Sequence, residues 1–265
     1  MDLISLVGIV GGVAAILLSA ILEGSELAAL VHPAAMLLIA GGTIGATIAC
    51  YSMEEILSIT KSTMEAVKRA SVEPEVLIAT LGELATLGRR EGLLVLEHYP
   101  LKLDNILLKR GIRLLVDGTA PEVLKDILVT QVATQEAQAK MQASIYQTAG
   151  GFAPTMGIIG TVVGLVHVLS NLSEPEMLGH AIAGAFLATL YGIGVANLVF
   201  LPLAKKLHYR AHQEAEVGLL IVEGLVSIQS GDNPRFIQEK LMSLIHEEKR
   251  GRVLAVQAAA AEVKQ

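Results

Sequence analysis

The positions of the basic residues constrain the fold of this chain more than any other feature. All 20 Lys and Arg lie within residues 61–140 and 205–264, so residues 1–51 and 149–203 contain none. These two bare regions hold four apolar stretches, at about residues 3–22, 33–51, 150–169 and 181–203. Each is close to the roughly 20 residues with which a helix crosses a hydrocarbon core of about 30 Å. The pattern predicts an all-α, polytopic membrane protein with four transmembrane helices and a helical cytoplasmic domain.

Composition excludes several other classes of protein. Charged residues make up 17% of the chain, against roughly 25% in an ordinary soluble domain. A single cysteine, Cys50, cannot form an internal disulfide, and no Cys/His cluster has zinc-ligand spacing. The formal charge of −6 gives no basic field to hold nucleic acid. We therefore expect the chain to have the membrane as a partner and not to bind nucleic acid.

The connectors inside each pair of spans, about 23–32 and 170–180, carry no Lys or Arg. Basic residues such as Lys61, Lys140 and Lys205 flank the opposite ends of the spans, which the positive-inside rule places in the cytoplasm. Both termini are then cytoplasmic. The predicted regions are transmembrane helices 1 and 2 (1–51), a cytoplasmic helical domain (52–148), transmembrane helices 3 and 4 (149–203) and cytoplasmic C-terminal helices (204–265).

The cytoplasmic segments have helical spacing of apolar residues and no convincing strand alternation. Pro74 suits a first helical turn, and helix breaks are predicted at Gly88, Gly92 and Gly111. Residues 122–147 contain no Gly or Pro, so a helix there can run unbroken into the third span. After the fourth span we predict a helix over 204–230, a turn at 231–234 and a further helix from Phe236 to Glu248.

The third and fourth spans carry small and hydroxyl residues on narrow faces. Thr161 and Thr189 can face a common cleft, although a buried Thr commonly bonds to a carbonyl of its own helix. Pro154 and Pro202 each remove a backbone hydrogen bond and permit a kink, which is either a hinge or a static bend. The many glycines in the spans allow close packing, within one subunit or between subunits.

An absence is equally informative. No Asp or Glu lies in the middle of any predicted span, yet proton and sodium relays in membranes depend on such carboxylates. If the chain belongs to an ion-driven machine, another subunit supplies that group. The sequence also shows no phosphate-binding Gly-rich loop and no catalytic constellation, so we expect neither an enzyme nor a cofactor.

Several motifs together resemble the flagellar stator A-subunits of the MotA/PomA family, within the MotA/TolQ/ExbB superfamily. The resemblance covers nearly the whole chain. It rests on the first span and on the segments His32–Ala35, Gly41–Thr43, Arg89–Glu97, Ala153–Thr161 and Ala188–Gly192.

The resemblance implies five copies of this chain around two copies of a MotB/PomB-type partner in the bacterial inner membrane. The partner supplies the missing carboxylate, and ion flow turns the ring of A-subunits against the rotor switch protein FliG. The resemblance therefore implies an ion-conducting motor subunit and not an enzyme.

Residue by residue, the resemblance assigns three kinds of site. Arg89, Arg90 and Glu97 match rotor-contacting positions, for which the alternative is a solvated surface group. Pro154 and Pro202 match span prolines that act as a conformational hinge. Thr161 and Thr189 line the ion path, and the hydroxyl of Thr161 favours sodium over the proton as the transported cation, while Thr189 discriminates poorly.

Two alternatives remain open at this stage. The related ExbB/TolQ energy-coupling subunits of the cell envelope also assemble as five copies around a partner pair, but they have three spans. A self-contained channel or transporter is the other alternative, and it would need its own charged or carbonyl-lined path.

Overall fold

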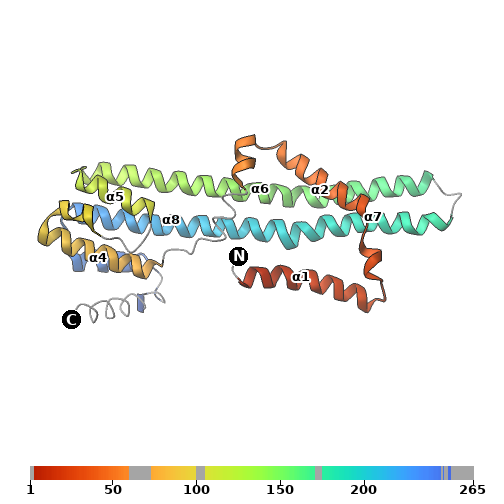
Figure 1. The fold of residues 1–265 in the computed structure, drawn as a ribbon, viewed down its shortest axis with the longest axis horizontal. Coiled ribbons are helices and arrows are strands. Elements are labelled where there is room, and N and C mark those ends of the chain that lie inside the picture. Colours follow the sequence, from red (N-terminus) through yellow and green to blue (C-terminus); the bar gives the residue numbers. More distant parts are fainter. Residues whose placement is uncertain are drawn as a thin grey trace. The chain divides into compact units, whose positions relative to one another are not determined.

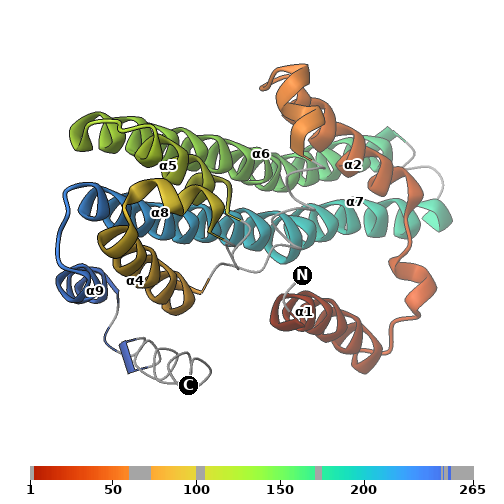
Figure 2. The same cartoon turned by 60° about the vertical axis from the view of Figure 1, so that its left-hand side comes forward.

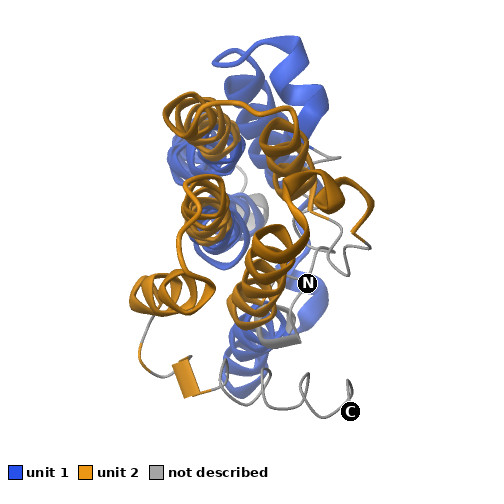
Figure 3. Ribbon diagram, turned by 90° about the vertical axis from the view of Figure 1, so that its left-hand side faces the viewer, with its two compact units in different colours: residues 1–69, 139–210 blue, residues 70–138, 211–265 orange. Residues whose placement is uncertain are grey.

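The computed structural model describes residues 3–59, 73–99, 105–170 and 175–245, and also residues 247, 250 and 251. These residues form helices and turns, with no strand among them. They divide into two compact units, unit 1 with residues 1–69 and 139–210 and unit 2 with residues 70–138 and 211–265 (Figure 3). Lys61, used above to orient the spans, and the tail after residue 251 lie outside the described residues.

Unit 1 is built from apolar helices that overlap the four predicted apolar stretches. Its elements are α1 (Leu3–Leu22), η1 (Leu27–Leu30), α2 (Pro33–Ile48), α7 (Pro175–Val195) and η3 (Ala196–Phe200), with part of α6 (Pro121–Ser170) and the start of α8 (Leu201–Gln229). Helix α6 has 50 residues, which confirms the prediction of a helix that runs unbroken into the third span. Figures 1 and 2 both show α6 and α7 side by side.

Three stretches of the described chain are long and apolar enough to cross a membrane, within Leu27–Ile48, Pro121–Ser170 and Leu178–Gln229. A shorter apolar stretch, Val7–Leu22, lies in α1. Large apolar side chains on these helices are exposed in the isolated chain, among them Val162 at 55% and Phe186 at 66%. Because such surface is unfavourable in water, it fits helices that face lipid or other subunits.

Helix α2 is held against α6 in an antiparallel arrangement. The Tyr51 hydroxyl, just after α2, lies 2.7 Å from the Thr148 hydroxyl of α6. Nearer the N-terminus of α2, a Cβ added to Gly42 would lie 2.7 Å from the sulfur of Met156 in α6. Residue numbers therefore rise along α2 as they fall along α6, and the glycine lets the two backbones approach.

Unit 2 has a conventional apolar core. Its elements are α4 (Pro74–Glu91), η2 (Leu93–His98), α5 (Ile106–Val116), α9 (Pro234–Ser243), the first part of α6 and the rest of α8. Leu81, Leu108, Leu128, Ile221 and Leu225 are fully buried in this core. Pro74 is the first residue of α4, as predicted, and α8 confirms the helix expected over 204–230.

Two of the three predicted glycine breaks are wrong. Gly92 does end α4, with φ of +88°, a conformation that favours glycine. Gly88 and Gly111, in contrast, lie inside α4 and α5. At Gly111 an added Cβ would lie 2.2 Å from a methyl carbon of Leu225. These glycines serve close packing in the core, which outweighs their low helix propensity of about 1 kcal/mol.

Helix α9 begins earlier and ends earlier than the predicted helix from Phe236 to Glu248. The predicted turn is present, with Gly231 at φ of +75°, and Asn233 caps the new helix by accepting the Arg235 N–H. After Ser243 the N–H groups of Leu244 and Ile245 donate to the carbonyls of Leu241 and Met242, three residues back. The α-helical pattern of bonds to the fourth residue back therefore ends there.

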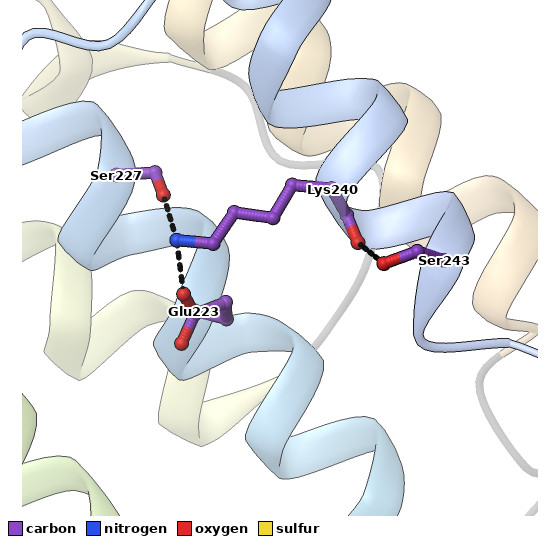
Figure 4. Close-up of polar contacts among 4 residues, drawn as sticks. All are labelled: Glu223, Ser227, Lys240 and Ser243. Atoms are coloured by element: carbon purple, nitrogen blue, oxygen red, sulfur yellow. Dashed lines mark hydrogen bonds and ion pairs between the residues drawn. The ribbon is translucent and has the colours of Figure 1, made fainter.

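Lys240 fastens α9 to α8. Its ammonium group pairs with the Glu223 carboxylate and lies 3.2 Å from the hydroxyl of Ser227, a residue that is 1% exposed (Figure 4). Both acceptors lie on α8, one turn apart. The contact gives the buried Ser227 hydroxyl a charged partner and fixes the position of α9.

Tyr99, just after η2, donates its hydroxyl hydrogen to the carboxylate of Glu83 on α4. Burial, followed by the hydrogen bond to Glu83 and the charge of Glu83, raises the pKa of Tyr99 from 10.0 to about 12. The bond joins the segment after Gly92 back to α4, so it helps to position the exposed residues between them.

We predict that Tyr99→Phe lowers the free energy of unfolding by about 1 kcal/mol at pH 8, because a hydrogen bond to a carboxylate is lost. The folded pKa of Tyr99 is raised, so this contribution is complete below pH 10 and is lost as pH rises toward 12. Denaturant unfolding of both proteins at pH 8 and above pH 10 measures the difference. A difference that does not shrink at high pH contradicts the assigned role.

Candidate functional site

The two predicted threonines meet between α6 and α7. The hydroxyls of Thr161 and Thr189 are in direct contact. Thr161 Oγ1 lies 3.1 Å from the carbonyl oxygens of both Gly157 and Ala185, and Thr189 Oγ1 lies 3.4 Å from that of Gly157. Thr161 thus bonds to a carbonyl of its own helix and also meets Thr189 and the carbonyl of Ala185 across the α6–α7 contact.

We call these four oxygens, from Thr161, Thr189, Gly157 and Ala185, the hydroxyl cluster. It contains four oxygens but only two hydroxyl hydrogens, so acceptor lone pairs are in excess. Hydroxyl and carbonyl oxygens are the ligands that hard cations prefer. Both threonines are half-buried, so the cluster lies at the edge of the α6–α7 contact.

Glycines make this cluster possible by bringing the backbones of α6 and α7 close together. A Cβ added to Gly192 would lie 2.5 Å from the carbonyl oxygen of Ala153 and 3.1 Å from Cα of Gly157. Further along, a Cβ added to Gly164 would lie 2.7 Å from that of Ala185. Numbers rise on one helix as they fall on the other, so the two helices are antiparallel, with small residues facing each other throughout.

Tyr191 ties α7 to the segment before α2. Its hydroxyl donates to the carbonyl of Leu30 and accepts the backbone N–H of His32 at 3.1 Å. Tyr191 belongs to the segment Ala188–Gly192 that carries the family resemblance, and in the structure its hydroxyl bonds to the backbone before α2. Nothing in the spacing of residues indicated that contact.

The two predicted hinge prolines have different surroundings. Pro154 lies inside α6, which continues through it to Ser170. Pro202 is the second residue of α8 and follows η3, a π turn in which the N–H of Leu201 bonds to the carbonyl of Ala196, five residues back. Sequence analysis missed this π turn. Since Pro202 has no N–H to donate, the wider turn accommodates the interruption.

Arg89, Arg90 and Glu97 lie in unit 2, away from the hydroxyl cluster in sequence. The two arginines occupy the last turn of α4, and Glu97 lies in η2, beyond the turn at Gly92. All three side chains are exposed. No ion pair joins them within the part of the chain that the structure describes. Their charges are therefore presented to the surroundings of the molecule.

Comparison with known proteins identifies the family. Residues 6–92 match the Motility protein A N-terminal family, and residues 101–217 match the MotA/TolQ/ExbB proton channel family. Chemotaxis protein PomA of Vibrio alginolyticus is 37% identical over 250 residues, which cover 94% of this chain and 98% of PomA. The chain belongs to the MotA/PomA family of flagellar stator subunits. Motility protein A of Bacillus subtilis is 36% identical over 245 residues, which cover 91% of this chain and 90% of that protein.

Solved structures support the same assignment. The flagellar MotAB stator complex from Bacillus subtilis matches with a TM-score of 0.87 and 35% identity, covering 94% of this chain and 98% of that chain. The structure of C. jejuni MotAB matches with a TM-score of 0.87 and 30% identity, over 93% and 97% of the two chains. The stator family suggested by the sequence motifs is thereby confirmed.

We predict that Gly192→Ala destabilises unit 1 by about 1–3 kcal/mol, because the new methyl group overpacks the contact with Ala153. The matched control is Gly194→Ala, where an added Cβ meets nothing within 4 Å. Thermal unfolding of the purified protein in detergent should show a lower midpoint for the first variant only. Equal midpoints would mean that the close approach at Gly192 does not stabilise the protein.

Proposed function

We propose that this chain is a flagellar stator A-subunit that, with a MotB/PomB-type partner, converts ion flow across the membrane into torque on the rotor protein FliG. The observation that carries the proposal is the match to MotAB stator complexes over more than 90% of this chain. In the proposed assembly, five copies surround two partner copies. Four spans cross the bacterial inner membrane, namely the three long apolar stretches and the shorter one in α1, and both termini are cytoplasmic.

The hydroxyl cluster is the proposed ion path within this subunit. It offers oxygen ligands without a negative charge, since no Asp or Glu lies within the apolar stretches of α2, α6 or α7. A carboxylate from the partner completes the path. One charge that crosses 100 mV releases about 2.3 kcal/mol, so several ions can drive a step against thermal noise.

Sodium is the cation that we propose for this path. The Thr161 and Thr189 hydroxyls and two carbonyl oxygens can replace part of the hydration shell of a hard cation. A proton needs no such oxygen cage, because it moves along hydrogen bonds.

Pro154 and Pro202 are the proposed hinges. Pro154 lies three residues before Gly157, whose carbonyl oxygen belongs to the hydroxyl cluster. Bending at Pro154 therefore moves a ligand oxygen. Pro202 adjoins the π turn η3, where the backbone hydrogen bonds are already displaced by one residue. Movement at either point couples the ion path to the cytoplasmic ends of α6 and α8.

Arg89, Arg90 and Glu97 are the proposed contacts with FliG. Their exposed charges suit a contact that must form and release at each step, because electrostatic attraction speeds association and each exposed pair contributes little to affinity.

The ExbB/TolQ alternative is weaker than the stator proposal. The match of residues 101–217 is to a family that includes TolQ and ExbB, but the match of residues 6–92 is to a family of motility proteins. A specific observation therefore favours the stator over the energy-coupling subunit.

The first functional test is swimming speed against external sodium at constant pH. The host lacks its own stator and carries this chain with its native B-partner. We expect speed to rise with sodium and to vanish without it. Thr161→Val keeps the shape of the side chain and should raise the half-maximal sodium concentration by about tenfold, since one hydrogen-bonding ligand is worth about 1–1.5 kcal/mol.

Thr155→Val is the matched control, because Thr155 is exposed on α6 and its hydroxyl donates to the carbonyl of Phe152. Sodium-independent swimming that stops with a protonophore overturns the ion assignment and keeps the stator. No swimming from an assembled complex supports the ExbB/TolQ alternative.

We also predict that Arg90→Glu and Glu97→Lys each lower torque by a factor of about 1.5 to 5, the range expected for exposed charge pairs. Lys125→Glu, an exposed charge reversal on α6, is the control. Torque is measured from the rotation of beads on flagellar stubs, with the amount of protein in the membrane measured in parallel. Unchanged torque in both variants would argue against the rotor contact.

A further inference from the structure

Two histidines that the proposed function does not use lie close together in unit 1. His32 immediately precedes α2, and His180 lies in the second turn of α7. Their ring centroids are 6.0 Å apart, and the rings are tilted by 45°. They come from segments almost 150 residues apart in the sequence, so the fold brings the two imidazoles together.

The His32 ring is held in place from three sides. Its Nδ1 accepts the N–H of Ala35 at 3.3 Å and so caps α2, and its backbone N–H donates to the hydroxyl of Tyr191. A Cβ added to Gly184 would lie 2.6, 2.9 and 3.0 Å from three atoms of the His32 ring. The nearest of these atoms is Nε2, so the Nε2 end of the imidazole packs against Gly184, one helical turn from His180.

We propose that His32 and His180 form a binding site for a late first-row divalent cation, with Zn²⁺ as the representative ion. Imidazole nitrogen is a preferred ligand of Zn²⁺, Cu²⁺ and Ni²⁺. With Zn–N distances of about 2.0–2.1 Å and tetrahedral angles, two ring centroids come to about 5 Å apart. Small side-chain rotations from the observed 6.0 Å separation achieve this, and His180 is exposed and free to adjust.

Coordination also moves a proton on His32. While Nδ1 accepts the Ala35 N–H, the neutral ring carries its hydrogen on Nε2. A metal bound at Nε2 requires this hydrogen to move to Nδ1, where it replaces the bond from Ala35. The metal and the cap of α2 therefore compete, and the long 3.3 Å bond is the one given up.

The site is open and distinct from the hydroxyl cluster. No group of three or more His, Cys, Asp or Glu side chains suited to a metal occurs among the described residues, so the proposed site has two protein ligands and leaves the other coordination positions to solvent. Its nitrogen ligands suit Zn²⁺, whereas the oxygens of the hydroxyl cluster suit a hard cation such as Na⁺.

The test is Zn²⁺ binding to the purified complex of this chain with its B-partner, measured by competition with a chromophoric chelator. We expect His180→Gln to weaken binding by at least about tenfold, the loss typical of disturbed metal ligation. His180 is exposed, so this variant should fold. Gly184→Leu keeps both histidines but occupies the space of the His32 ring, and it should weaken binding similarly.

His98→Ala, an exposed histidine in unit 2, is the control and should bind like the wild type. Cu²⁺ electron paramagnetic resonance should show two coordinated nitrogens in the wild type and one in His180→Gln. Equal affinity in the wild type and both variants, or a single nitrogen in the wild type, overturns the proposal. Binding is measured without rotation, so a failure of the proposed motor function leaves this result readable.

Discussion

The close contact between α6 and α7 is the interaction on which the rest of unit 1 depends. At Gly157 and Gly192 there is no room for a side chain, and the two backbones touch through Cα and carbonyl atoms. In lipid, the hydrophobic effect does not favour contact between apolar helices, so dispersion and hydrogen bonding must hold them. The same close approach puts the Thr161 hydroxyl within reach of a carbonyl on the other helix.

This contact also fits the proposed assembly of several subunits. Two helices in such close contact enclose no channel, and their outward faces carry exposed apolar side chains such as Ile158 and Phe186. The oxygens of the hydroxyl cluster can share a cation, but they cannot neutralise it. In the proposed function, the partner chain therefore supplies the compensating charge, because the apolar stretches of α2, α6 and α7 contain no acidic residue.

Much of the fold could be predicted because membrane helices have strong sequence signals. The range of α1 and the unbroken course of α6 follow from long apolar runs and from the absence of Gly and Pro over residues 122–147. The pairing of Thr161 with Thr189 followed from helical periodicity. Periodicity failed where tertiary packing decides, as at Gly111, where a leucine methyl from α8 occupies the space of a side chain. The meeting of His32 with His180 has no local signal at all, because it depends on how α2 packs against α7.

The π turn η3 adds one residue to the chain without changing the direction in which the later side chains point. A π turn holds one residue more than the α-helical turn that it replaces. Small and apolar positions that follow a 3.6-residue period along α7 therefore resume on α8 one position late. Loss of one residue within 196–200 would give a regular α-helix with both faces kept, whereas the same loss within α8 would rotate every later side chain by about 100°. Chains that differ in length by one residue here can thus present the same surfaces.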